Sequence, residues 1–213
     1  MTAIKICGIT REEDALTAAR SGAHAIGLVF YAKSPRHVTP QRAAELMRAL
    51  PPFVTRVGLF VDASADEVKQ TLDTARVDLL QFHGDETPEY CREVSARCGV
   101  PYLKAVRVRA GLDLLQYAHD YPDAKALLLD AYVEGTNGGT GATFDWALIP
   151  QNLPLPVVLS GGLTPENVTS AIRAVQPWAV DVSSGVESSK GIKSAEKIAA
   201  FVTGVRNARS ADV

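Results

Sequence analysis

Residues 156–163 read PVVLSGGL, and residues 179–186 read AVDVSSGV. Each stretch is an apolar run that ends in a turn of serine and glycine, and the two lie one strand-plus-helix unit apart. Such turns leave backbone N–H groups accessible, and a helix that follows adds its positive N-terminal end. In an eight-fold (β/α)₈ barrel, the loops after strands seven and eight are the usual phosphate site. The pattern therefore predicts such a barrel and a phosphorylated small-molecule ligand.

The small residues of both turns are the candidates for binding this phosphate through their backbone amides. The alternative is that both turns are tight connections without a ligand. The candidates are Gly161, Gly162, Ser183, Ser184 and Gly185.

The whole chain alternates between short β-rich runs and amphipathic helical patterns. The expected strands are 3–7, 25–30, 55–61, 79–82, 102–106, 126–130, 156–160 and 179–183. The expected helices are 11–21, 40–50, 64–75, 87–98, 112–119, 143–149, 164–175 and 194–206. Eight units of about 27 residues predict a single (β/α)₈ TIM barrel over residues 1–213. A doubly wound sheet is the competitor, but CGIT at 7–10 lacks the glycine fingerprint expected after its first strand.

Composition excludes several classes of function. The 213 residues carry 22 Lys+Arg and 24 Asp+Glu, a net charge of −2, so no basic surface predicts nucleic-acid binding. The apolar stretches are strand-sized, which predicts no membrane span, and the N-terminal sequence does not resemble a signal peptide. Three cysteines cannot all pair, which favours a reducing, cytoplasmic compartment. We expect a monomer by default, with a homodimer left open.

Strand alternation predicts which side chains face the barrel interior. With Ile4 and Ile6 facing the helices, Lys5 and Cys7 point inward. The same alternation is expected to turn four further polar side chains inward: Arg56, Gln81, Lys104 and Asp181. Since an isolated buried charge is very costly, we expect Asp181 to neutralise one or more of the three cations Lys5, Arg56 and Lys104.

Cys7 and Asp130 are the candidate catalytic residues, because each ends a predicted strand on the face where such barrels carry their active sites. A cysteine in a strand is commonly a packing residue, but the cation of Lys5 two residues before Cys7 favours the thiolate. Asp130 is the one polar residue of ALLLD at 126–130, and its alternative role is to brace a loop.

Arg36 and His83 are further candidates near the same rim. The planar guanidinium of Arg36 suits a carboxylate, although a solvated loop arginine is the alternative. His83 could line the site or brace the rim through hydrogen bonds. No set of residues has the spacing of metal ligands, so we expect no metal. The glycine-rich loop at 132–141 could close over the site or be an ordinary connection.

Ten segments along the chain resemble the phosphoribosylanthranilate isomerase family. They are KICGIT at 5–10, GLVF at 27–30 with SPR at 34–36, VGLFV at 57–61, QFHG at 81–84, LLD at 128–130, GTG at 139–141 with FDW at 144–146, LSGGL at 159–163 and DVSSGVESSKG at 181–191. The resemblance implies a (β/α)₈ barrel that acts without a cofactor in tryptophan biosynthesis. The implied reaction is the Amadori rearrangement of N-(5-phosphoribosyl)anthranilate to 1-(2-carboxyphenylamino)-1-deoxyribulose 5-phosphate.

The resemblance also implies a role for each candidate residue. Asp130 is the expected general acid and Cys7 the expected general base, while Arg36 holds the anthranilate carboxylate and the serine–glycine turns hold the phosphate. Two alternatives stay open: another phosphosugar-handling barrel enzyme, and a non-catalytic barrel that binds a phosphosugar.

Overall fold

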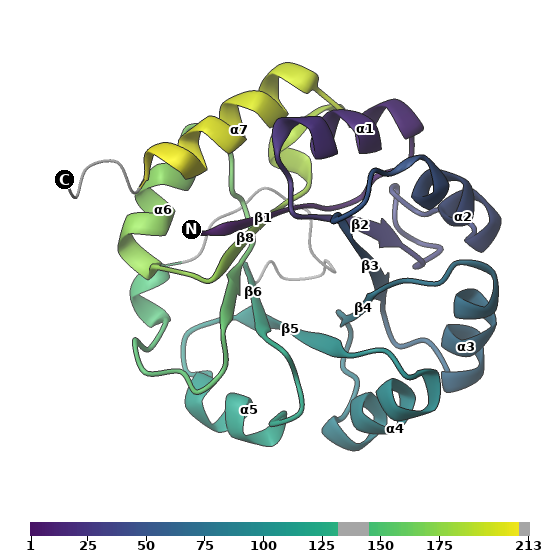
Figure 1. The fold of residues 1–213 in the computed structure, drawn as a ribbon. Helices are drawn as coiled ribbons and strands as arrows, with labels where there is room; N and C mark the ends of the chain where they lie inside the picture. Colours follow the sequence, from purple (N-terminus) through teal and green to yellow (C-terminus); the bar gives the residue numbers. More distant parts are fainter. Residues whose placement is uncertain (132–144, 209–213) are drawn as a thin grey trace.

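The computed structural model describes residues 1–131 and 145–208, and its centre is a closed barrel of eight parallel strands (Figure 1). Each strand pairs with its neighbours in sequence, and β8 closes the barrel against β1, with Lys5 opposite Asp181. The strands are β1 (Ala3–Ile6), β2 (Ala25–Val29), β3 (Thr55–Phe60), β4 (Leu79–Phe82), β5 (Tyr102–Val108), β6 (Leu127–Ala131), β7 (Val157–Leu159) and β8 (Ala179–Val182). The predicted barrel and all eight strand positions are confirmed.

Helices surround the barrel on its outer face (Figure 1). They are α1 (Glu12–Ser21), α2 (Pro40–Ala49), α3 (Ala65–Thr74), α4 (Pro88–Cys98), α5 (Leu114–Asp120), α6 (Val168–Val175) and α7 (Ala195–Asn207). Several start at the capping residues that the sequence offers. At α3, the Ser64 side chain accepts from the Glu67 amide, and the Glu67 carboxylate accepts from the Ser64 amide.

Two expected helices differ from the structure. In the described part of 143–149, the chain forms only a 3₁₀ turn, η1 (Trp146–Leu148), and Pro150 follows at once. The helix expected from residue 164 begins at Val168. Before it, the Asn167 side chain accepts from the Thr164 amide and donates to the Gly162 carbonyl, which holds a turn instead.

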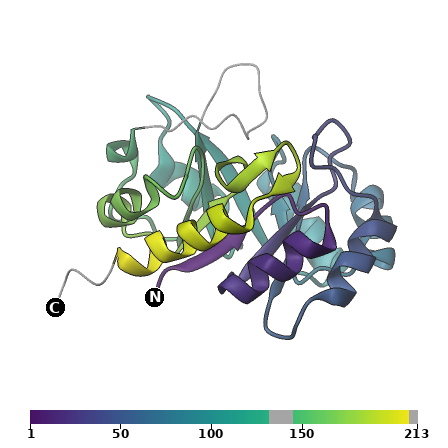
Figure 2. The same ribbon diagram turned by 90° about the horizontal axis from the view of Figure 1, so that it is seen from above.

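An antiparallel hairpin that the sequence analysis did not foresee lies between β8 and α7. It consists of β9 (Glu187–Ser189) and β10 (Ile192–Lys193), and a 3₁₀ turn, η2 (Ser184–Val186), precedes it. The hairpin lies on the side of the barrel away from the N-terminus (Figure 2). It therefore lies at the C-terminal ends of the strands.

Two apolar layers hold the barrel together. The larger lies between strands and helices and includes Ile6, Leu28, Phe82 and Phe201. The smaller fills the barrel interior, and its buried members are Leu103, Ala105, Ala126, Leu128, Val158 and Ala179. A third buried cluster contains Cys7, Val29 and Leu59, and together these sets show which face of each strand points inward.

The expected cluster of inward charges is only partly correct. Lys5 donates to Asp181 at 2.9 Å inside the barrel, as predicted. Lys104 is outside the barrel instead, because Leu103 and Ala105 on either side of it fill the interior. Its ammonium group donates to Glu86 at 3.1 Å and to the Gly84 carbonyl at 2.8 Å.

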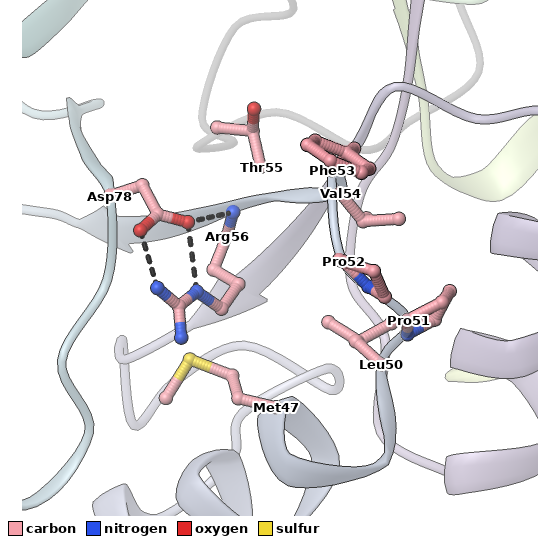
Figure 3. Close-up of a pocket in the computed structure, with 9 residues that line it drawn as sticks. All are labelled: Met47, Leu50, Pro51, Pro52, Phe53, Val54, Thr55, Arg56 and Asp78. Carbon is pink, nitrogen blue, oxygen red and sulfur yellow. Dashed lines mark hydrogen bonds and ion pairs between the residues drawn. The ribbon is translucent and has the colours of Figure 1, made fainter.

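Arg56 also points away from the barrel interior, at the N-terminal ends of the strands. It binds Asp78 through Nε–Oδ2 at 2.8 Å and Nη2–Oδ1 at 2.5 Å (Figure 3). The pair lines a pocket together with the residues between α2 and β3, where the Phe53 side chain is fully exposed. No described helix combines the length and the apolar character that a membrane crossing requires.

Candidate active site

Cys7 directly follows β1 and is buried at the C-terminal end of the barrel. Gly27 on β2 makes room for it, since a Cβ atom at position 27 would lie 2.6 Å from the Cys7 Sγ. Gly8 has a φ of +72°, and a Cβ atom there would lie 2.4 Å from Cδ of Arg36 and 3.0 Å from Oγ of Ser183. The strand end carrying the thiol is therefore packed closely against two other candidate residues.

Burial and charge act in opposite directions on Cys7. Burial raises the pKa of its thiol, while the cations of Lys5 and Lys193 lower it, and the net direction is upward. Asp181 weakens the help from Lys5 because it pairs with that ammonium and itself raises the pKa of Cys7. Lys5 thus acts in the direction that the sequence predicted, but in this structure burial outweighs it.

Asp130 on β6 is buried and contacts His83, which follows β4. His83 Nε2 lies 3.1 Å from Asp130 Oδ2, and His83 Nδ1 lies 2.8 Å from the Gln81 side-chain amide. His83 therefore braces the rim through hydrogen bonds, as one of its two expected roles requires, and its role in lining a substrate site stays a prediction. Gln81 was expected inside the barrel, and it is there.

Arg36 is buried and binds Glu187 on β9 through two parallel hydrogen bonds. Its Nε lies 2.7 Å from Oε1 and its Nη2 2.9 Å from Oε2. Among the described residues, Nη1 makes no hydrogen bond, so the Nη1–Nη2 edge of the guanidinium can bind a second carboxylate. The expectation of a solvated loop arginine is wrong.

Glu187 and Lys193 are the site residues that sequence reasoning missed. Lys193 Nζ lies 2.9 Å from Glu187 Oε1 and 3.0 Å from the Ser183 carbonyl oxygen. Burial raises the pKa of Glu187, but Arg36 and Lys193 lower it more, and the net direction is downward. Glu187 stands in the quoted segment DVSSGVESSKG, but only the fold brings it to Arg36.

The two serine–glycine turns lie against each other. A Cβ atom at Gly185 would lie 1.9 Å from the Leu163 carbonyl oxygen, so only glycine permits this contact. Gly161 and Gly162 have φ values of +80° and +65°, which favour glycine. The α6 N-terminus does not directly follow its turn, since α6 begins at Val168. The turns can therefore offer backbone amides, with less support from a helix end than the sequence predicted.

The structure brings Cys7, Arg36 and the turn after β8 together, and it brings Asp130 on β6 into contact with His83, which follows β4. The loop at 132–141 lies outside the described residues. Over residues 1–131 and 145–208, no group of three or more His, Cys, Asp or Glu residues has the arrangement of a metal site.

Comparison with known proteins identifies the family. Residues 4–204 match the family model described as N-(5'phosphoribosyl)anthranilate (PRA) isomerase. A curated protein of that name from Nitrosospira multiformis is 59% identical over 202 residues, which cover 95% of each chain.

Two solved structures of this family are similar to the chain over almost its whole length. Phosphoribosyl anthranilate isomerase from Thermotoga maritima superposes with a TM-score of 0.89 at 41% identity, covering 97% of this chain and 100% of that chain. A structure of the isomerase in complex with reduced 1-(o-carboxyphenylamino)-1-deoxyribulose 5-phosphate has a TM-score of 0.86 at 40% identity, with 97% and 100% covered. The chain belongs to the phosphoribosylanthranilate isomerase family.

Proposed function

We propose that this chain converts N-(5-phosphoribosyl)anthranilate to 1-(2-carboxyphenylamino)-1-deoxyribulose 5-phosphate in tryptophan biosynthesis, with Asp130 as acid and Cys7 as base. The observation that carries the assignment of roles is a buried thiol and a buried carboxyl group, each at the C-terminal end of a strand of one barrel. An aldose-to-ketose rearrangement needs one proton donor and one proton acceptor at neighbouring substrate atoms.

Ring opening is the first step. Asp130 donates its proton to the furanose ring oxygen, and the bond between that oxygen and C1′ breaks. The electron pair of the anthranilate nitrogen moves to C1′, which forms a protonated imine. The positive charge that forms in this step lies on the substrate's own nitrogen.

Proton removal from C2′ is the second step. The thiolate of Cys7 takes this proton, and the C–H electrons move toward the imine nitrogen to give an enolamine, which tautomerises to the ketone. Since burial raises the pKa of Cys7, the unliganded site favours the thiol. The positive charge of the imine favours the thiolate, so the thiol loses its proton to solvent before the sulfur accepts the C2′ proton. The imine nitrogen accepts the electrons, so the reaction requires no cofactor.

The two ends of the substrate are held by different chemistry. The Nη1–Nη2 edge of Arg36 binds the anthranilate carboxylate, while Glu187 holds the other edge of the guanidinium. The phosphate binds the backbone amides of the two turns, and the Lys193 ammonium next to Ser183 adds positive charge on that side. Holding both ends places the reacting carbons between acid and base.

The test is turnover of substrate generated in situ, followed as the loss of anthranilate-type fluorescence. The purified chain is expected to remove the signal at a rate proportional to enzyme concentration. Binding without turnover would favour the non-catalytic phosphosugar-binding barrel instead. Turnover of a different phosphosugar with no loss of this fluorescence would favour another barrel enzyme.

Location and assembly belong to the same proposal. We expect a cytoplasmic enzyme whose partner is the small phosphorylated substrate, and a monomer by default with a homodimer left open. Light scattering distinguishes a mass of 22.7 kDa from its double. A concentration-independent dimer would contradict the monomer.

A further inference from the structure

A row of three buried side chains leads from the barrel interior to Asp130. Gln81 Nε2 lies 2.8 Å from His83 Nδ1, and His83 Nε2 lies 3.1 Å from Asp130 Oδ2. Gln81 has no exposed surface, and His83 and Asp130 are 8% and 5% exposed. The mechanism above uses only the last member of this row.

The chemistry of these groups sets the direction of both hydrogen bonds. An amide nitrogen can only donate, whereas a neutral imidazole has one nitrogen that donates and one that accepts. Because Gln81 Nε2 faces His83 Nδ1, that nitrogen accepts. The imidazole proton is then on Nε2, which donates to Asp130 Oδ2.

We propose that Gln81 is a positioning residue that holds His83 as its Nε2–H tautomer and thereby keeps the transferable proton of Asp130 on Oδ1. This inference rests on the proposed role of Asp130 as the acid. A neutral His83 that donates to Oδ2 has no lone pair there to accept the acid proton. Once the proton has moved to the substrate, the same N–H donates to the carboxylate left behind and stabilises it. The opposite tautomer accepts the proton of Asp130 and draws it away from the substrate.

Packing alone does not explain an amide at position 81. Its register partners on β3 and β5 are Leu59 and Leu103, both apolar. Among the described residues, the buried Gln81 Oε1 has no hydrogen-bond partner. An unsatisfied buried acceptor lowers stability, and an apolar side chain of similar length would avoid this penalty. The contact with His83 is therefore what the amide contributes here.

The direct test is nuclear magnetic resonance of the full chain labelled with ¹⁵N-histidine. The chain has four histidines, and the signals of His83 are those absent from the spectrum of His83→Gln. A ring nitrogen that carries a proton resonates far from one that does not. We expect a protonated Nε2 and an unprotonated Nδ1 in the wild type. A proton on Nδ1, or on both nitrogens, overturns the proposal without any need for an activity measurement.

Two substitutions test the consequence for the reaction. Gln81→Glu keeps the size but accepts instead of donating, so it favours a proton on His83 Nδ1. It is expected to lower kcat by about 10- to 100-fold, a large part of what one acid contributes, and to leave KM within about threefold. Gln81→Met removes the donor without adding an acceptor and is expected to have a smaller effect on kcat.

Leu103→Met is the matched control, because it changes the neighbouring interior position with a side chain that cannot donate a hydrogen bond to His83, and it should stay within about twofold of wild type. A folded Gln81→Glu variant with wild-type kcat overturns the inference. Asp130→Asn tests the proposed function separately. Normal turnover in that variant removes Asp130 as the acid, whichever tautomer His83 adopts.

Discussion

Inside the barrel, the side chains of Lys5 and Asp181 are 6% and 5% exposed, whereas those of Arg56 and Asp78 at the N-terminal end are 38% and 39% exposed. Both are ion pairs with good geometry, and Arg56 even makes two parallel bonds (Figure 3). An ion pair that is partly exposed contributes at most about 1 kcal/mol to the free energy of unfolding. Water stabilises the separated charges almost as well as the pair stabilises them. A buried pair differs in that losing one partner leaves a charge without solvent.

The contrast between buried and partly exposed charges also holds for the C-terminal end of the barrel. There Arg36, Glu187 and Lys193 form a second buried set of charges beside Cys7. This end of the molecule removes its charges from water, while the N-terminal end keeps the charges of Arg56 and Asp78 in contact with water.

The largest expected effect lies at the two proposed catalytic positions. Cys7→Ser and Asp130→Asn should each lower kcat by about 10²–10⁴, because each removes one proton-transfer group, with little change in KM. Steady-state rates of the loss of anthranilate-type fluorescence measure kcat and KM. Cys98→Ser on α4 and Asp120→Asn at the end of α5 are matched controls that should stay within about twofold. Near-normal turnover of either site variant removes that residue from the mechanism.

Next in size is the buried pair. Lys5→Met leaves Asp181 charged and without its cation, and it should lower the free energy of unfolding by about 3–5 kcal/mol. Denaturant titration measures this. The double variant Lys5→Met with Asp181→Leu should recover most of the loss, because neither charge remains. An equal loss in the single and double variants would show that the pair itself, and not the orphaned charge, sets the stability.

A smaller effect is expected where Glu187 holds Arg36. Glu187→Gln weakens the bonds that orient the guanidinium, so KM should rise by about tenfold with kcat less affected. Glu196→Gln on the exposed face of α7 removes the same charge without touching Arg36. Unchanged KM in Glu187→Gln would mean that Arg36 is oriented by its packing alone.

Cys7 also predicts a pH dependence of stability. Burial raises the pKa of its thiol in the folded chain, so the folded state keeps a proton that the unfolded state loses. This contribution is complete below the pKa of an unfolded cysteine, about 8.5, and is lost as pH rises through the folded pKa. Relative to Cys7→Ser, the free energy of unfolding of the wild type should therefore fall by up to about 1.4 kcal/mol per pH unit between the unfolded and the folded pKa of Cys7. A constant difference between the two proteins from pH 7 to about 10 would contradict the raised pKa.

The smallest effect is expected at the N-terminal end. Arg56→Ala should change the free energy of unfolding by less than about 1 kcal/mol and leave kcat and KM unchanged. A larger loss of stability would erase the distinction between the two ends of the barrel.

By itself, the sequence determined the barrel, the strand order, the inward orientation of Cys7 and Gln81, and the place of Asp130 at a strand end. These follow from local signals: period-two alternation along a strand and the turn residues that end it. In the described part of the helix expected at 143–149, Pro150 restricts Ile149, which is extended, and the turn before it is 3₁₀.

Only the tertiary structure decided which charges pair. In β5, every residue from Tyr102 to Val106 is buried, since one face of the strand packs on helices and the other fills the barrel. No polar alternation distinguishes the two faces there, which is why Lys104 was expected inside. The hairpin β9–β10 carries Glu187 to Arg36 across a separation of 151 residues, and no pattern within either segment encodes that contact.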